Sequence, residues 1–239
     1  MAVYYRSQGL VIRKVDFGEA DQIFKIYTKD FGKLDIFGKA VRKVESKLRS
    51  GADFLYLSNL EFVQGRNKKT LTDAVVLENF SEIRKSLRKM EISRAMSEVL
   101  DRLAGLEDKN EKLWKLIKES FSKLGEIEES KSILLYYYFL WNLFSILGYL
   151  PELKTCVSCF KKPFLNAIYF SPAEGGMICH SCFANSPDSF SVKPDLIKVL
   201  RIITQKDWPV VARLKIDANL KTSLVNVSQK YLDEIIRKN

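Results

Sequence analysis

Two Cys-x-x-Cys pairs constrain the fold of this chain more than any other feature of its sequence. Cys156 and Cys159 form the first pair, nineteen residues separate the pairs, and Cys179 and Cys182 form the second. Two such pairs can complete a tetrahedron of thiolates around one zinc ion. Because sulfur then fills every coordination position, we predict one structural Zn²⁺ and no catalytic metal. Two disulfides, a redox pair and an iron–sulfur cluster are the alternatives, and His180 is expected beside the site rather than in it.

Charge and composition limit the class of protein. The 239 residues are 46% apolar and 28% charged, which is typical of a globular protein with room for two modest domains. The formal charge of +10 favours nucleic acid or an anionic membrane as partner, although a basic protein without such a partner would have the same charge. The beginning of the sequence does not resemble a secretory signal, so we predict a cytoplasmic, nucleoid-associated protein. A reducing compartment favours metal ligands over disulfides.

The hydrophobic pattern changes near residue 80. Before Phe80, short apolar runs punctuated by glycines indicate about five strands, which favours a small barrel such as an OB-fold. After it, apolar residues recur every three or four positions, which indicates helices. We therefore predict an α+β multidomain chain with an N-terminal OB-fold β-barrel (1–80), followed by an all-α helical domain (81–239) with an inserted four-cysteine zinc module (151–186).

One uncharged segment, from Ser132 to Pro151, is about long enough to cross a bilayer. Three consecutive tyrosines and Asn142 lie in its middle, and no second such segment exists. A helix buried in a protein core, ended by Gly148, is therefore the preferred interpretation, with a membrane helix as the alternative.

A run of basic residues after the third predicted strand is a second candidate site. A basic loop at a barrel rim would neutralise phosphates, and further cations could extend the same face. The alternative is a solvated loop without a partner. Aromatic side chains in the barrel could also stack on bases, but most should belong to its core. The predicted DNA-binding residues are Lys33, Lys39, Arg42, Lys43, Lys47, Arg49, Arg66, Lys68 and Lys69, and the aromatic candidates are Tyr4, Tyr5, Phe17, Phe24, Tyr27, Phe31 and Phe37.

The sequence offers no convincing catalytic motif, and we predict that the chain is not an enzyme. Two Asp-Phe-Gly triplets, at residues 16–18 and 30–32, lack the other kinase motifs and are interpreted as turns. The glycine-rich stretch at 32–40 lacks the spacing of a phosphate-binding loop. The enzyme alternative is a metal-dependent nuclease, in which magnesium would be held by Asp16, Glu19, Asp21 or Asp35.

Several stretches resemble the bacterial recombination mediator family RecO. They are GLVIRKVDFGEAD (9–21), YTKDFGKLDIFGKAVRK (27–43), LGYLPELKTCVSC (147–159) and YFSPAEGGMICHSC (169–182). The last two are the most specific. Residues 83–129 match only in helical character, and the C-terminal tail only loosely.

The resemblance implies an OB-fold, a helical domain and a zinc module. It also implies binding of single- and double-stranded DNA, annealing of complementary strands, and action with RecR to help RecA replace single-strand-binding protein. In the family the basic face of the barrel and the nearby helical surface contact DNA. In some members the helical domain docks the C-terminal tail of single-strand-binding protein. The uncharged segment would then be a buried helix, which argues against membrane insertion. A zinc-containing RNA-binding or regulatory protein stays the non-enzymatic alternative.

Overall fold

The structure is a computed structural model that describes residues 3–162 and 168–238. Within it the chain divides into two compact units, Met1–Ser132 and Ile133–Asn239.

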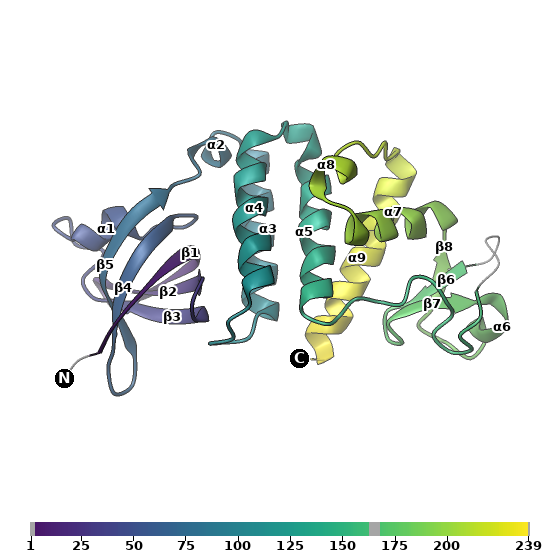
Figure 1. The fold of residues 1–239 in the computed structure, drawn as a ribbon, viewed down its shortest axis with the longest axis horizontal. Helices are drawn as coiled ribbons and strands as arrows, with labels where there is room; N and C mark the ends of the chain where they lie inside the picture. Colours follow the sequence, from purple (N-terminus) through teal and green to yellow (C-terminus); the bar gives the residue numbers. More distant parts are fainter. Residues whose placement is uncertain (1–2, 163–167, 239) are drawn as a thin grey trace. The chain divides into compact units, whose positions relative to one another are not determined.

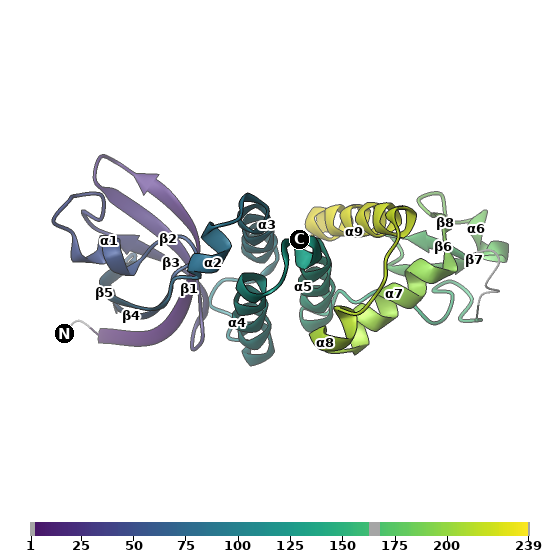
Figure 2. The same cartoon turned by 90° about the horizontal axis from the view of Figure 1, so that it is seen from above.

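The first unit begins with a closed barrel. Its strands are β1 (Val3–Phe17), β2 (Asp21–Thr28), β3 (Gly32–Gly38), β4 (Leu57–Gln64) and β5 (Lys69–Glu78), paired in the order β1-β2-β3-β5-β4 (Figures 1 and 2). All pairs are antiparallel except β3 with β5. The long β1 pairs with both β2 and β4, and a register shift between Val11 and Arg13 lies within its pairing with β2. Such bulges increase the bending of a strand, which suits a closing barrel.

The barrel interior is filled by alternating apolar side chains. Val11, Phe24, Ile26, Ile36 and Phe62 are at most 1% exposed and belong to one cluster. A short helix, α1 (Lys47–Gly51), links β3 to β4 and ends against β5. A Cβ at Gly51 would lie 1.8 Å from the carbonyl oxygen of Ala74, so only glycine permits this approach.

Helices complete the first unit: α2 (Ser81–Arg84), α3 (Leu87–Leu103), α4 (Glu111–Glu126) and the 3₁₀ helix η1 (Glu129–Lys131). Ser86 caps α3 by accepting a hydrogen bond from the Lys89 N–H, and Asn110 caps α4 in the same way. Because α3 packs on β1, the compact unit extends past residue 80. The change from strands to helices nevertheless falls between β5 and α2, so the division into domains at residue 80 stays a prediction.

The second unit combines helices with a small sheet. Its elements are α5 (Ser132–Ile146), β6 (Ile168–Ser171), β7 (Gly176–Cys179), α6 (His180–Phe183), β8 (Phe190–Val192), α7 (Pro194–Gln205), α8 (Trp208–Val211) and α9 (Ala218–Lys238). The strands pair in the order β7-β6-β8. The strands β6 and β7 lie within the predicted cysteine module, but β8 lies beyond its predicted end at residue 186, so the region outside the module is helical without being all-α. Residues 163–167 of that segment lie outside the described residues.

The uncharged segment forms α5, and most of its aromatic side chains are buried. Trp141 is fully buried, donates a hydrogen bond to Ser228 (2.9 Å) and stacks on Tyr231 of α9. After the helix, Gly148 has φ of 84° and the Tyr149 N–H bonds to the Phe144 carbonyl, as in a glycine-terminated helix. No helix in the described parts of the chain has both the length and the apolar character needed to cross a membrane.

Candidate metal centre and nucleic-acid interface

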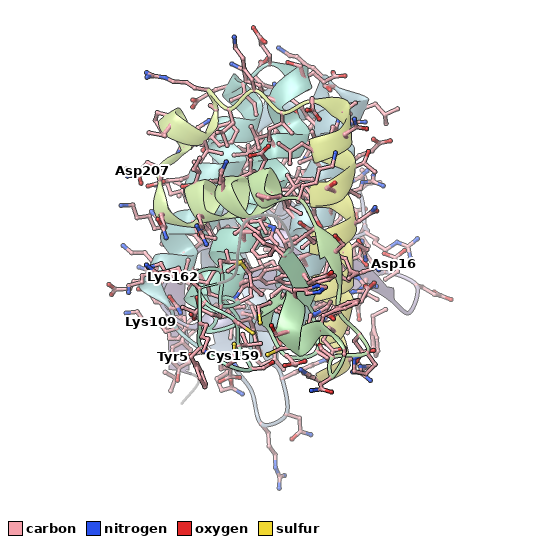
Figure 3. The ribbon with its side chains drawn as sticks, turned by 90° about the vertical axis from the view of Figure 1, so that its right-hand side faces the viewer. Tyr5, Asp16, Lys109, Cys159, Lys162 and Asp207 are labelled. Atoms are coloured by element: carbon pink, nitrogen blue, oxygen red, sulfur yellow. The ribbon has the colours of Figure 1, made fainter. Side chains whose placement is uncertain are left out.

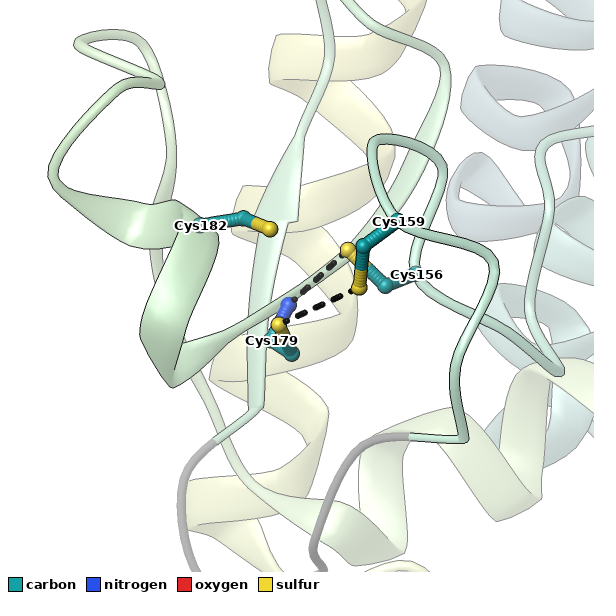
Figure 4. Close-up of side chains that lie close together, drawn as sticks. All are labelled: Cys156, Cys159, Cys179 and Cys182. Atoms are coloured by element: carbon teal, nitrogen blue, oxygen red, sulfur yellow. Dashed lines mark hydrogen bonds between the residues drawn. The ribbon is translucent and has the colours of Figure 1, made fainter.

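The four cysteines come from two structural contexts. Cys156 and Cys159 lie in a turn before β6, whereas Cys179 ends β7 and Cys182 lies in α6 (Figure 4). The first pair is held in a tight loop, in which the Phe160 N–H bonds to the Cys156 carbonyl (2.8 Å) and Phe160 takes φ of 61°. Figure 3 shows Cys159 close to other sulfur atoms.

Backbone pairing brings the two cysteine pairs together. The Val157 N–H bonds to the Met177 carbonyl, and the Met177 N–H bonds to the Glu152 carbonyl, each at 2.9 Å. A Cβ at Gly176 would lie 2.7 Å from the Glu152 carbonyl oxygen, so glycine permits the close approach. The loop that carries the first pair is thereby fixed against β7.

The sulfur atoms are close enough to share one metal ion. All four lie within 4.8 Å of one another, and Cys159 Sγ and Cys179 Sγ are 3.7 Å apart. All four cysteines are free, and a disulfide would need about 2.05 Å between sulfurs. In the described residues this is the one group of three or more metal-ligating side chains within such reach.

Hydrogen bonds inside the cluster shift the thiol pKa values in opposite directions. Burial raises the pKa of Cys156, but donors led by the Cys179 N–H (3.4 Å) outweigh it and lower the pKa to about 6. Hydrogen bonding to Cys179, with burial second, raises the pKa of Cys182 to about 12. Cys156 thus favours the thiolate and Cys182 the thiol, whose proton a metal ion would displace on binding.

His180 lies beside this cluster, as the sequence suggested. Its Nδ1 is 3.3 Å from the Tyr169 hydroxyl, and its ring stacks on Tyr169. The metal-ligating group comprises the cysteines alone.

Most of the predicted DNA-binding residues are exposed, but two are buried or half-buried and form ion pairs. Lys33 is only 7% exposed, and its ammonium donates to the Asp101 carbonyl (2.5 Å) and pairs with the Asp101 carboxylate. Lys69 is half-buried and pairs with Glu107 (2.5 Å). The structure does not present Lys33 to a ligand. The exposed cations are Lys39, Arg42, Lys43, Lys47, Arg49, Arg66 and Lys68.

Two arginines of the basic run line the same cavity as a lysine of β1. A cavity of about 300 Å³, here called the barrel cavity, is lined by Lys14, Arg42, Arg49 and Asp53 among others. Lys14 forms an ion pair with Asp53, and Arg42 lies 3.6 Å from Asp16. Lys14 is not among the residues predicted to bind DNA, because it lies far from the basic run in sequence. Its position on an outward face of β1 was the available signal.

The aromatic candidates divide in the same way. Phe24 and Tyr27 are fully buried, and Tyr5 packs with Phe31 and Phe62 against the core. Phe17, by contrast, is 54% exposed. It packs edge-to-face on Phe37, whose ring also carries the Lys68 ammonium 3.3 Å above its centre; Tyr4, 63% exposed, is the other exposed aromatic candidate.

Three of the four acids of the nuclease alternative have protein partners. Asp16 accepts from Gln22, Asp21 accepts from the Ala40 N–H (2.7 Å), and Asp35 pairs with Lys25 (3.2 Å). Both Asp-Phe-Gly triplets fall at turns, which span residues 18–20 and 29–31, as predicted.

Together these features define a class: a β-barrel protein with a basic surface, joined to a helical region that carries a four-thiol cluster. Comparison with known proteins identifies the family within this class. Residues 1–80 match the model described as Recombination protein O N terminal, and residues 84–239 match Recombination protein O C terminal.

Relatives named DNA repair protein RecO agree along most of the chain. One from Dehalococcoides mccartyi is 32% identical over 221 residues, which are 92% of this chain and 86% of the relative. Another, from Caldanaerobacter subterraneus, is 26% identical over 229 residues, 96% of this chain and 92% of the relative. The chain therefore belongs to the RecO family of DNA repair and recombination proteins. Because this family comprises recombination mediators, the prediction that the chain is not an enzyme is confirmed.

Proposed function

We propose that this chain is a DNA-binding recombination mediator that anneals complementary strands. With RecR it would help RecA load on DNA coated by single-strand-binding protein, whose C-terminal tail would dock on the helical domain. Single- and double-stranded DNA are the proposed ligands, and the cytoplasm, at the nucleoid, is the proposed location. The observation that carries the DNA-binding part is the barrel cavity, where Lys14, Arg42 and Arg49 gather.

The barrel topology supports an OB-fold for this function. The closed order β1-β2-β3-β5-β4, the long bent β1 and a helix between β3 and β4 suit that fold. OB-folds bind single strands with a cationic groove and stacked aromatic rings. Phe17 is our candidate ring, because it is exposed and packs edge-to-face on Phe37. The Lys68 ammonium lies over the same Phe37 ring.

The metal would be one structural zinc. Four thiolates at about 2.3 Å from zinc form a tetrahedron with edges of roughly 3.8 Å. The 3.7 Å between Cys159 Sγ and Cys179 Sγ suits that edge. With Cys156 and Cys182 completing the set, zinc would fix the loop before β6 to α6 without supplying a reactive site.

Annealing follows from charge neutralisation. Two strands held against the same cations repel one another less than they do in solution, so their encounter becomes more frequent. No bond is made or broken by the protein in this scheme. Both annealing and binding should weaken as salt rises.

The test replaces Arg42, Lys43 and Lys47 with glutamate. We expect loss of single-strand binding and of annealing on strands coated by single-strand-binding protein, with an unchanged melting temperature. A matched control replaces three exposed lysines of α4 with glutamate, namely Lys112, Lys115 and Lys118. It changes the net charge of the protein by the same amount. Undiminished binding by the first variant, or equal loss in the control, would refute the proposed site.

Two further experiments test the nuclease and the RNA-binding alternatives. Shortened strands after incubation with magnesium would indicate a nuclease. Preferential competition by RNA of the same sequence would indicate an RNA-binding protein.

Phe17→Ala should weaken single-strand binding more than Phe17→Tyr, because tyrosine retains the stacking face.

A further inference from the structure

Two exposed phenylalanines border the cysteine cluster of the second unit. Phe160 directly follows Cys159 and is 78% exposed, and Phe183 directly follows Cys182 and is 36% exposed. The four cysteine sulfur atoms lie within 4.8 Å of one another, and Figure 4 shows Cys159 and Cys182 reaching the cluster from opposite sides. The two phenylalanines therefore lie on either side of one metal position.

The backbone and the surroundings of Phe160 do not favour a phenylalanine. Its φ of 61° lies in the left-handed region, which favours glycine and is uncommon for a bulky side chain. The hydrogen bond from its N–H to the Cys156 carbonyl fixes this turn, and most of the side chain is in water. A glycine would suit the backbone and a polar residue would suit the solvent. Residues held in such conformations are concentrated at functional sites, which points to a ligand for the ring.

The Phe183 ring is fixed in orientation by its neighbours. Tyr169 of β6 lies face to face with it, with 3.9 Å between the ring centres and 19° between the ring planes. His180 stacks on the same tyrosine, and its Nδ1 is 3.3 Å from the tyrosine hydroxyl. Because the ring is held in place before a ligand arrives, binding to it would cost little conformational entropy.

Two lysines come directly after the first of these rings. Lys161 and Lys162 are exposed, and the described residues give neither of them an ion pair. Two acidic side chains of the module accept hydrogen bonds instead: Glu152 from backbone N–H groups and Glu174 from a serine hydroxyl. The lysines therefore retain their charge for a ligand.

Open rings beside unpaired cations suit a single-stranded nucleic acid. Its bases stack on aromatic side chains while cations neutralise its phosphates. Each nucleotide offers a base and a phosphate side by side, which matches Phe160 next to Lys161. A duplex would not use the rings, because its bases already stack on one another.

We propose that Phe160, Lys161, Lys162 and Phe183, here called the module patch, form a second single-strand site, separate from the basic surface of the barrel. One base would stack on each ring, and the lysines would bind phosphates. The patch has two cations, against seven exposed cations among the residues predicted at the barrel, so it binds a strand more weakly. The inference rests on the proposed function, because this patch would hold the second of the two strands that annealing requires.

The test uses tryptophan fluorescence to detect stacking. The three natural tryptophans, Trp114, Trp141 and Trp208, are at most 8% exposed, so Phe160→Trp adds an exposed indole. It is made in the full-length zinc-loaded chain that carries the three glutamates of the barrel test, which removes tight binding at the barrel. We expect oligothymidine to quench the added fluorescence saturably, with a salt slope of about −1.4 for two phosphate contacts.

The lysines are tested in the same chain. Lys161→Gln together with Lys162→Gln should make the quenching nearly independent of salt and weaken it. The matched control is Lys215→Gln together with Lys221→Gln, two exposed lysines outside the module. The control should leave both the quenching and its salt slope unchanged.

Phe160→Gly separates stacking from stability. Glycine suits the φ of 61°, so the melting temperature should stay the same or rise. By fluorescence anisotropy, binding to the module patch should weaken roughly tenfold, as expected for one lost base stack. With the barrel intact, the same change should slow annealing and leave tight binding of one strand unaltered.

Four results would overturn the inference. If oligothymidine does not quench the added tryptophan, while the barrel glutamates abolish tight binding, the module patch fails and the proposed function stands. If the barrel glutamates leave tight binding intact and annealing does not respond to Phe160→Gly, both fail. If Phe160→Gly lowers the melting temperature, Phe160 is a packing residue. If an acidic peptide quenches the fluorescence and oligothymidine does not, the patch binds a protein.

Discussion

The salt dependence of DNA binding tests which cations contact phosphate. Nine basic residues were predicted from the sequence, and the structure leaves seven of them exposed, whereas Lys33 is buried and Lys69 is half-buried. Each phosphate contact with a single strand contributes about −0.7 to the slope of log K against log salt concentration. Seven contacts give a slope of roughly −5.

That slope predicts a measurable loss of affinity. Between 50 and 200 mM salt the affinity for an oligonucleotide should fall by about a thousandfold. Glutamine at Arg42, Lys43 and Lys47 removes three contacts, so the slope should become roughly −3. Fluorescence anisotropy with a labelled oligonucleotide at about five salt concentrations measures both slopes.

Lys33→Gln is the decisive control. Its ammonium is bonded to Asp101 inside the first unit, so the variant should lose stability and leave the slope unchanged. If Lys33→Gln reduces the slope by as much as one exposed cation does, the reasoning from burial is wrong. A triple variant with an unchanged slope would refute the role of the basic run.

Three other predictions concern stability. Cys159→Ser should reduce bound zinc from one ion per chain, measured by mass spectrometry, and lower the melting temperature; loss of DNA binding from a folded variant would contradict a purely structural metal. Tyr231→Phe removes the hydrogen bond to the Tyr149 carbonyl (2.6 Å) and should cost about 1 kcal/mol in urea unfolding; an unchanged midpoint would contradict this. Burial raises the pKa of Asp53, but hydrogen bonds from Lys14 and the N–H of the next residue outweigh it and lower the pKa. This stabilisation is present above the unfolded value of about 3.9 and is lost as pH falls through the lower folded value. Asp53→Asn should therefore lower the melting temperature at pH 7 and have little effect near pH 2; an equal effect at both would contradict the ion pair.

Local sequence patterns predicted much of the architecture. The glycine-punctuated runs before Phe80 are the barrel strands, and the three-to-four spacing after it gives α3 and α4. Gly148 ends the uncharged helix, as predicted. These features depend on residues close in sequence, whose periodicity and turn preferences are visible without a tertiary structure.

Errors arose where distant segments pair. The cysteine segment contains β6 and β7, and β6 finds its other partner in β8, beyond the predicted end of the module. Short strands of three or four residues give almost no periodic signal, because their stability comes from the partner strand. The prediction of an all-α region was therefore too simple.

By itself, the sequence determined that two cysteine pairs of matched spacing would form one cluster, and that strands would give way to helices near residue 80. Only the tertiary structure decided which charges are available. Lys33 belongs to the predicted basic set, yet it is buried against Asp101 of α3, whereas Lys14, which lies far from the basic run, joins Arg42 and Arg49 in the barrel cavity. The physical reason is that a lysine has the same charge in either place, and its exposure depends on which distant element packs against it.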